Sequence, residues 1–190
     1  MNSRAQRMFV WLLPLVLLTA FTAESAFADL VVQPATTTVN IAQSFFLDVA
    51  ITNVTDLYAF QFDLGFDPNV VSVTNVSEGP FLPSGGPTFF IPGIIDNVGG
   101  TVAFNADTLE SAISGVTGSG VLVTFDFAPV AAGTSQISIF NVILLDSNGA
   151  GIGTLTQDGT VTVSAVPEPS SLLLLLGGMG GLMVRKRITT

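Results

Sequence analysis

The most informative feature of this sequence is what it lacks, because cysteine and histidine are absent and positive charge is confined to the two ends. The five basic residues are Arg4, Arg7, Arg185, Lys186 and Arg187. Disulfides, thiol chemistry and zinc sites built from cysteine or histidine are therefore excluded. The usual pairs of a nucleophile with a histidine base are excluded as well.

The region between residues 29 and 165 is strongly acidic. All of the 14 acidic residues except Glu24 and Glu168 lie in it, and it contains no lysine, arginine or histidine, so that its formal charge is −12. Affinity for nucleic acids depends on neutralising phosphates with lysine and arginine. We therefore expect no nucleic-acid partner.

The first 28 residues have the composition of a secretory signal peptide. Two arginines precede an apolar run, Met8–Ala20, and Ala26 and Ala28 place small residues at positions −3 and −1 of a cleavage site. The mature chain is then expected to begin at Asp29, outside the cytoplasm. An uncleaved membrane anchor is the alternative.

The last 25 residues combine three different segments. A Pro167-Glu168-Pro169 motif precedes an apolar run of 13 residues, Leu172–Val184, and the basic cluster Arg185-Lys186-Arg187 follows it. A comfortable bilayer span needs about 20 apolar residues, so the run spans only if the segment from Val166 onward is included. The basic cluster would hold its end in the cytoplasm as a positive-inside stop.

This arrangement resembles the PEP-CTERM sorting signal over residues 166–190. The resemblance implies export by a Gram-negative bacterium, a transient inner-membrane anchor, and processing by exosortase, which would recognise Pro167, Glu168 and Pro169 and remove the tail. The final location would be the cell envelope or the extracellular matrix. A proline-rich stalk before a permanent anchor is the alternative.

Residues 29–165 show the pattern of an all-β domain. Apolar side chains alternate with polar or small ones over 45–52, 58–66 and 121–128, which is typical of half-buried strands. Turn signals separate the strands, among them Asn53–Asp56, Gly99-Gly100 and Ser147-Asn148-Gly149. This spacing predicts a β-sandwich.

The order of these segments resembles a cohesin domain. The resemblance is carried by Ile51–Gly79, Gly100–Ala106, Ser114–Ile139, Asn141–Ile152 and Gly159–Val163. It implies a nine-stranded jelly-roll sandwich, flanked here by a signal helix and a hydrophobic C-terminal helix. Cohesins bind dockerin modules without catalysis, so the resemblance implies a protein partner, possibly dockerin-like.

The positions that match the dockerin-binding surface differ from the family pattern. The third strand of dockerin-binding cohesins offers an asparagine and an aspartate, where this sequence has Ala59 and Gln61. The outward candidates for a partner site are Gln61, Asp63 and Asn105. Solvated polar residues on a sheet face are the alternative interpretation.

The residues also bear on three further functions. A glycosidase would need a carboxyl group of raised pKa in an apolar cleft, whereas Asp48, Asp63 and Asp126 occupy outward strand positions.

Carbohydrate binding would need exposed aromatic rings, for which Phe89 and Phe90 are the candidates. Calcium is the one metal considered, at Asp146-Ser147-Asn148-Gly149, although a plain β-turn explains that motif and no metal site is predicted.

The sequence therefore predicts an exported, non-enzymatic module of the cell surface or matrix that binds a protein partner. The alternative is a carbohydrate-binding module in polysaccharide catabolism or in an exopolysaccharide matrix. A structural surface protein without a specific ligand is the third possibility.

Overall fold

A computed structural model describes residues 27–165, and nearly all of this region is β-strand. One 3-10 turn, η1 (Leu82–Ser84), interrupts ten strands: β1 (Ala28–Gln33), β2 (Thr36–Asn40), β3 (Phe45–Gly65), β4 (Val71–Glu78), β5 (Ile91–Asp96), β6 (Thr101–Thr108), β7 (Val116–Pro129), β8 (Gly133–Asp146), β9 (Thr154–Gln157) and β10 (Gly159–Ser164). The two predicted flanking helices fall on residues that the structure does not describe. Among residues 27–165, no helix has the length and apolar character that crossing a bilayer requires.

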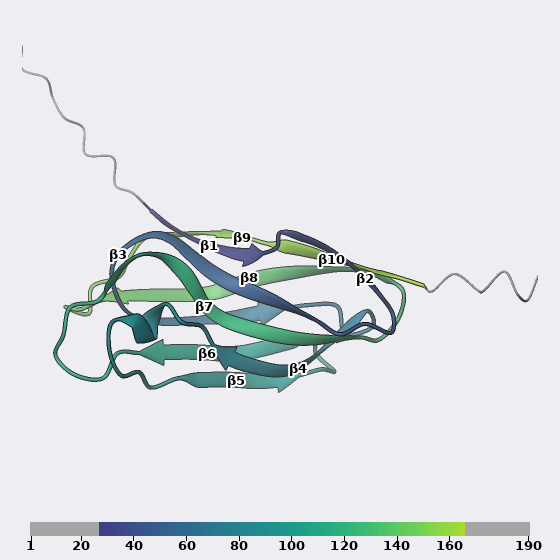
Figure 1. Cartoon of the computed structure of the whole chain (residues 1–190), viewed down its shortest axis with the longest axis horizontal. Helices are drawn as coiled ribbons and strands as arrows, with labels where there is room; N and C mark the ends of the chain where they lie inside the picture. The colour runs from purple at the N-terminus through teal and green to yellow at the C-terminus, as the bar shows by residue number, and fades with distance from the viewer. Residues whose placement is uncertain (1–26, 166–190) are drawn as a thin grey trace, which may run out of the picture.

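The strands form two layers that share β3, with β1, β9 and β10 along one side of the view and β5 and β6 along the other (Figure 1). The first layer has the order β9-β1-β3-β7-β4. The second has the order β2-β10-β8-β3-β6-β5. Pairing is antiparallel except between β1 and β9 and between β2 and β10. The predicted jelly-roll sandwich is confirmed.

The structure has ten strands where the resemblance implied nine. The first extended segment is divided at residues 34 and 35, so that β1 pairs with β3 in the first layer and β2 pairs with β10 in the second. One stretch of chain thus contributes to both layers.

β3 crosses from one layer to the other, and the predicted turn at Asn53–Asp56 is therefore wrong. This segment lies inside a single strand of 21 residues. Asn53 and Asp56 have φ values of 55° and 60°, which bend the strand without ending it. Leu57, directly after the bend, pairs with β7 of the first layer and with β8 of the second.

The core lies between the layers and is dominated by aromatic and branched side chains. Phe62, Phe125 and Phe127 are completely buried. The ring of Phe62 meets that of Phe125 edge to face at 6.2 Å, and Phe45 stacks on Phe127 at 5.3 Å. The alternation in the sequence identified these inward residues correctly, because a strand with one buried face repeats every two residues.

Candidate functional site

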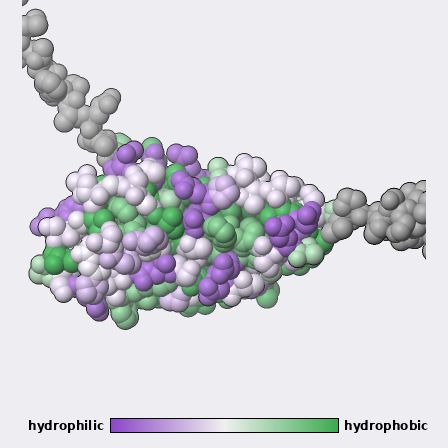
Figure 2. Space-filling model, viewed as in Figure 1, coloured by the Kyte–Doolittle hydropathy of each residue, from purple (hydrophilic) through white to green (hydrophobic). Residues whose placement is uncertain are grey.

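The outer face of the first layer carries polar side chains that bind one another. Thr124 donates to a carboxylate oxygen of Asp48 across the β3–β7 pair, at 2.6 Å. Asn75 donates to Asp126 across the β4–β7 pair, at 3.1 Å. Figure 2 shows hydrophilic residues interspersed with hydrophobic ones on the side of the domain that it draws. Asp48 and Asp126 are thus paired within the face.

The outer face of the second layer is different, because the side chains at its centre are uncharged and all but Gln61 are apolar. On β3, Gln61 lies between Ala106 of β6 and Ile143 of β8. Two residues earlier, Ala59 lies between Thr108 and Leu145 in the same two strands. The side chain of Ile143 is 51% exposed, and the residues around Gln61 form a shallow hollow. We call Ala59, Gln61, Ala106, Ile143 and Leu145 the docking face.

Asp63, a predicted partner residue, lies on this side of β3 but uses both carboxylate oxygens within the domain. Oδ1 accepts the backbone N–H of Phe104 at 2.7 Å, and Oδ2 accepts the side-chain amide of Asn141 at 2.7 Å. Phe104 and Asn141 have positive φ values and mark irregularities in β6 and β8. Asp63 therefore stabilises two bulges that flank the docking face.

Asn105, the third predicted partner residue, is completely buried, so its outward assignment is wrong. A bulge in β6 reverses the alternation, with Phe104 half exposed at φ 62° and Asn105 turned inward. The Asn105 amide donates to the carbonyl oxygens of Phe62 and Val102. Its role is to satisfy backbone groups beside the bulge.

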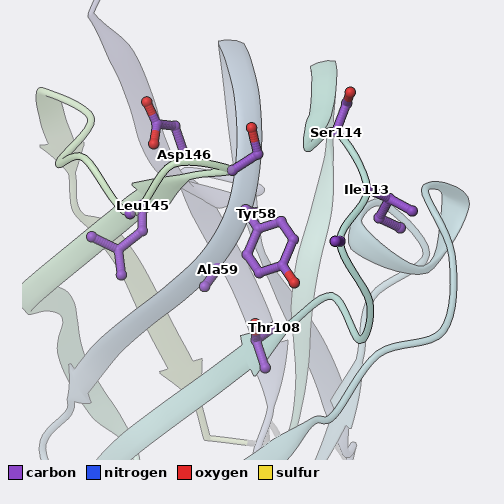
Figure 3. Close-up of a pocket in the computed structure, with 10 residues that line it drawn as sticks. Tyr58, Ala59, Thr108, Ile113, Ser114, Leu145 and Asp146 are labelled. Atoms are coloured by element: carbon purple, nitrogen blue, oxygen red, sulfur yellow. The ribbon is translucent and has the colours of Figure 1, made fainter.

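A pocket with a volume of about 700 Å³ opens at the end of the docking face (Figure 3). Apolar, hydroxyl and carboxylate groups line it together: Tyr58, Ala59, Thr108, Ala112, Ile113, Ser114, Leu145, Asp146, Ser147 and Gly149. Ala59 and Leu145 also belong to the docking face. The two features are therefore continuous.

Asp56, at the bend of β3, holds the two loops that border this pocket. One of its oxygens accepts the N–H of Gly115 at 2.6 Å, and the other accepts the hydroxyl of Ser147 at 2.7 Å. These bonds, that of Ser147 first, hold the pKa of Asp56 below its usual value. The 109–115 and 147–150 segments are thus connected through one carboxylate.

The predicted calcium motif forms a turn on the rim of the pocket. Oδ1 of Asp146 accepts the backbone N–H groups of Asn148 and Ala150, both at 2.8 Å. Within residues 27–165 there is no group of three or more acidic side chains that could hold a metal ion. The motif is built as a turn, with Asp146 as its cap.

A buried carboxyl group that the sequence did not single out connects the two layers. Asp107 of β6 is 3% exposed and faces Glu78 at the end of β4. Burial, and then the charge of Glu78, raises the pKa of Asp107 to about 7. The Thr88 hydroxyl donates to Oε1 of Glu78. The sequence could have indicated Asp107 only as an acid at an inward strand position. The bulge at Phe104 shifts the alternation along β6, so a regular period of two does not identify that position as inward.

The remaining predicted residues lie apart from this site or outside the described chain. Phe89 is 59% exposed, whereas Phe90 packs against the core, so the two rings do not form one platform. Ala28 is buried at the start of β1. Pro167, Glu168, Pro169, Arg185, Lys186, Arg187 and Ala26 lie outside the described residues.

Comparisons with known proteins agree with this architecture. A family model described as the cohesin domain matches residues 30–163, and one described as the PEP-CTERM protein-sorting motif matches residues 165–187. No curated protein matches the chain.

Similar solved structures are cohesins. A non-cellulosomal cohesin of Archaeoglobus fulgidus is 16% identical with a TM-score of 0.59, over 73% of this chain and 92% of that one. The Coh-OlpA–Doc918 complex of Clostridium thermocellum contains a chain that is 15% identical with a TM-score of 0.61, over 73% and 100%. Cohesin CaCohA2 of Clostridium acetobutylicum is 18% identical with a TM-score of 0.57, over 74% and 93%. At identities this low, the structural similarity shows a shared fold and nothing more.

Proposed function

The chain belongs to the cohesin domain family, and on this premise we propose that it is an exported, non-enzymatic module that binds a protein partner through its docking face. The PEP-CTERM motif indicates export through the envelope of a Gram-negative-type bacterium. The family consists of binding modules, and the acids on the two outer faces serve as hydrogen-bond partners within the domain.

The observation that carries this proposal is the lack of charge on the docking face. The described region has 12 acids and no bases, yet Ala59, Gln61, Ala106, Ile143 and Leu145 form a continuous uncharged surface. The centres of protein–protein interfaces are depleted in charge, and the surrounding rim is polar. A flat sheet face with this composition suits a protein surface better than a small polar ligand.

The chemistry of the face also limits the kind of partner. The C. thermocellum structure is a complex of a cohesin with a dockerin. Here Ala59 has no polar side-chain atom, and Gln61 is the one side chain of the docking face that can donate and accept hydrogen bonds. We expect a partner, dockerin-like or otherwise, that packs small apolar side chains against this face and makes few hydrogen bonds to its centre.

This proposal is tested by placing one charge on each outer face. In Ile143→Arg the arginine replaces a side chain of the docking face that is 51% exposed, whereas in Leu155→Arg it replaces a side chain of β9 that is 59% exposed. Cross-linked capture from the secreted proteins of the source cells should recover a partner with the wild type and with Leu155→Arg. Ile143→Arg should lose at least tenfold of the captured material. Equal capture by both variants would contradict the proposal.

Carbohydrate binding is the second candidate, and the exposed ring of Phe89 is the observation that favours it. A glycan array probed with the wild type and with Phe89→Ala separates the two functions. We expect no signal above background. A glycan signal that disappears in Phe89→Ala, without a protein partner, would replace the first proposal with this one.

The sorting step is a separate part of the proposal. A transient anchor through Leu172–Val184, followed by exosortase processing near Pro167-Glu168-Pro169, would place the domain in the envelope or the matrix. Intact mass spectrometry of the exported protein should show a chain that lacks residues 172–190. A full-length C-terminus on the exported protein would contradict exosortase processing.

A further inference from the structure

The inner side of β6 carries a carboxyl group that the described part of the chain leaves partly unsatisfied. Asp107 lies opposite Phe60 of β3 and is 3% exposed. Its Oδ1 accepts the backbone N–H of Thr108 at 2.8 Å, whereas Oδ2 is enclosed and accepts no hydrogen bond from residues 27–165. A buried carboxylate oxygen without a partner is costly, so this group requires a proton or a cation beside it.

Two further side chains with oxygen atoms lie next to Asp107. Its carboxyl group is in hydrogen-bonding contact with that of Glu78, which lies at the end of β4 in the other layer. The Thr88 hydroxyl donates to Oε1 of Glu78, and its oxygen retains lone pairs for a ligand. Because Glu78 is exposed, this cluster of three side chains is buried on the Asp107 side and reaches solvent on the other.

No side chain among residues 27–165 can neutralise the two carboxylates of this cluster. That region includes no lysine, arginine or histidine, and its formal charge is −12. The negative potential of such a domain attracts cations from solution. A shared proton would neutralise one carboxylate of the pair, whereas a divalent cation would neutralise both.

The chemistry of the cluster selects among the divalent cations. Two carboxylates and a hydroxyl are hard oxygen ligands, and the chain has no cysteine or histidine to favour zinc or copper. Magnesium requires a nearly ideal octahedron, whereas calcium accepts six to eight oxygen atoms in irregular geometry and takes some of them from water. The exposed side of Glu78 gives water access to the cluster.

We propose that Asp107, Glu78 and Thr88 bind one calcium ion, with water completing its coordination. Glu78 and Thr88 lie near the two ends of the segment that leads from β4 in the first layer to β5 in the second. The ion therefore ties both ends of this segment to β6 and holds the layers together at their edge. The site lies on the inner side of β6, away from the docking face, so the inference does not rest on the proposed function.

Equilibrium dialysis of the full chain against radioactive calcium tests this site directly. The wild type should bind calcium saturably, with a dissociation constant on the order of 10⁻⁴–10⁻³ M, as extracellular calcium modules do. Asp107→Asn and Glu78→Gln each remove one charged ligand and keep the shape of the side chain, so both should weaken binding at least tenfold. Glu110→Gln is the matched control, because it removes the same charge from an exposed side chain shortly after β6, and it should change binding less than twofold.

Thermal unfolding provides a second measurement, because an ion that binds the folded state raises its stability. At constant ionic strength, about 10 mM calcium should raise the Tm of the wild type by about 4 °C more than that of Asp107→Asn. The same concentration of magnesium should produce less than half of the rise in the wild type. The exposed position of Glu78 keeps Glu78→Gln informative even if Asp107→Asn does not fold.

Two results would overturn the inference: equal calcium binding by the wild type and Glu78→Gln, or equal effects of calcium and magnesium on the Tm of the wild type. The first would mean that the carboxyl pair holds a proton, and the second would mean that divalent cations act only by screening the acidic domain. Neither result bears on partner capture by Ile143→Arg, which tests the proposed function alone.

Discussion

The two outer faces of the sandwich are built from the same alternating strands, yet they treat their polar groups differently. On the first layer, Asp48 and Asp126 bind side chains across the strand pairs and stay at the surface. On the second layer, Asp63 turns to the bulges beside it, and the centre of the face is left to alanine, glutamine, isoleucine and leucine. Acids thus remain on the first surface with hydrogen-bond partners across the strands, whereas the centre of the second surface has no charged side chain.

This difference shows that an outward acid is a poor indicator of a binding site by itself. A carboxylate that accepts one internal hydrogen bond on each oxygen has about half of its capacity left for a ligand, because a carboxylate has about four acceptor sites. The residues that distinguish the docking face are the ones without charge. The pocket adjoins this face close to the point at which β3 passes between the layers, at Leu57.

The largest expected effect comes from Gly115→Ala, which disturbs the close approach of a loop to β3 beside the point at which β3 passes between the layers. A Cβ at Gly115 would lie 2.4 Å from the carbonyl carbon and oxygen of Asp56, so that the loop and β3 must separate. We expect the free energy of unfolding to fall by roughly 2–3 kcal/mol, measured by urea denaturation. Gly151→Ala is the control, since a Cβ there meets nothing within 4 Å. Similar losses in both variants would show that Gly115 does not depend on this close approach.

The next effect sharpens the comparison between the two faces. Asp63→Ala removes the acceptor for the Phe104 N–H and for the Asn141 amide, whereas Asp48→Ala removes one bond from the Thr124 hydroxyl. Asp63→Ala should lower the free energy of unfolding by about 2 kcal/mol and Asp48→Ala by about 1 kcal/mol, because the first leaves a strand N–H without its partner. Equal losses in urea denaturation would mean that the two faces do not differ in this respect.

The smallest effect concerns the carboxyl pair that joins the layers. The pKa of Asp107 is raised from 3.8 to about 7 in the folded protein. Between these values the folded state binds more protons than the unfolded state, so the stability contributed by Asp107 falls as the pH rises through this window and is lost above it. The Tm should therefore be several degrees lower at pH 8 than at pH 5, and this difference should be smaller in Asp107→Asn. An unchanged difference would exclude Asp107 as the cause.

Much of the fold could be predicted from the residues, and less of the site. The alternation around Phe62 and Phe125 identified the core, since burial on one side of a strand leaves a period of two. The same rule failed at Asn105, because the bulge at Phe104 inserts a residue and exchanges the two sides. The turn signal at Asn53–Asp56 was also misleading, because these polar residues mark a bend within β3 instead of a turn. Gln61 is the one predicted partner residue that lies on the docking face.

The sequence by itself determined the anionic, cation-free middle, the sandwich with its inward side chains, and the two family resemblances. These properties depend on composition and on short-range order along the chain. Only the tertiary structure decided that Asp63 stabilises bulges, that Asp107 meets Glu78, and that Tyr58 and Asp146 share a pocket. The physical reason is that each of these arrangements depends on which strands become neighbours and on where a bulge shifts their register, and neither is written in any local pattern.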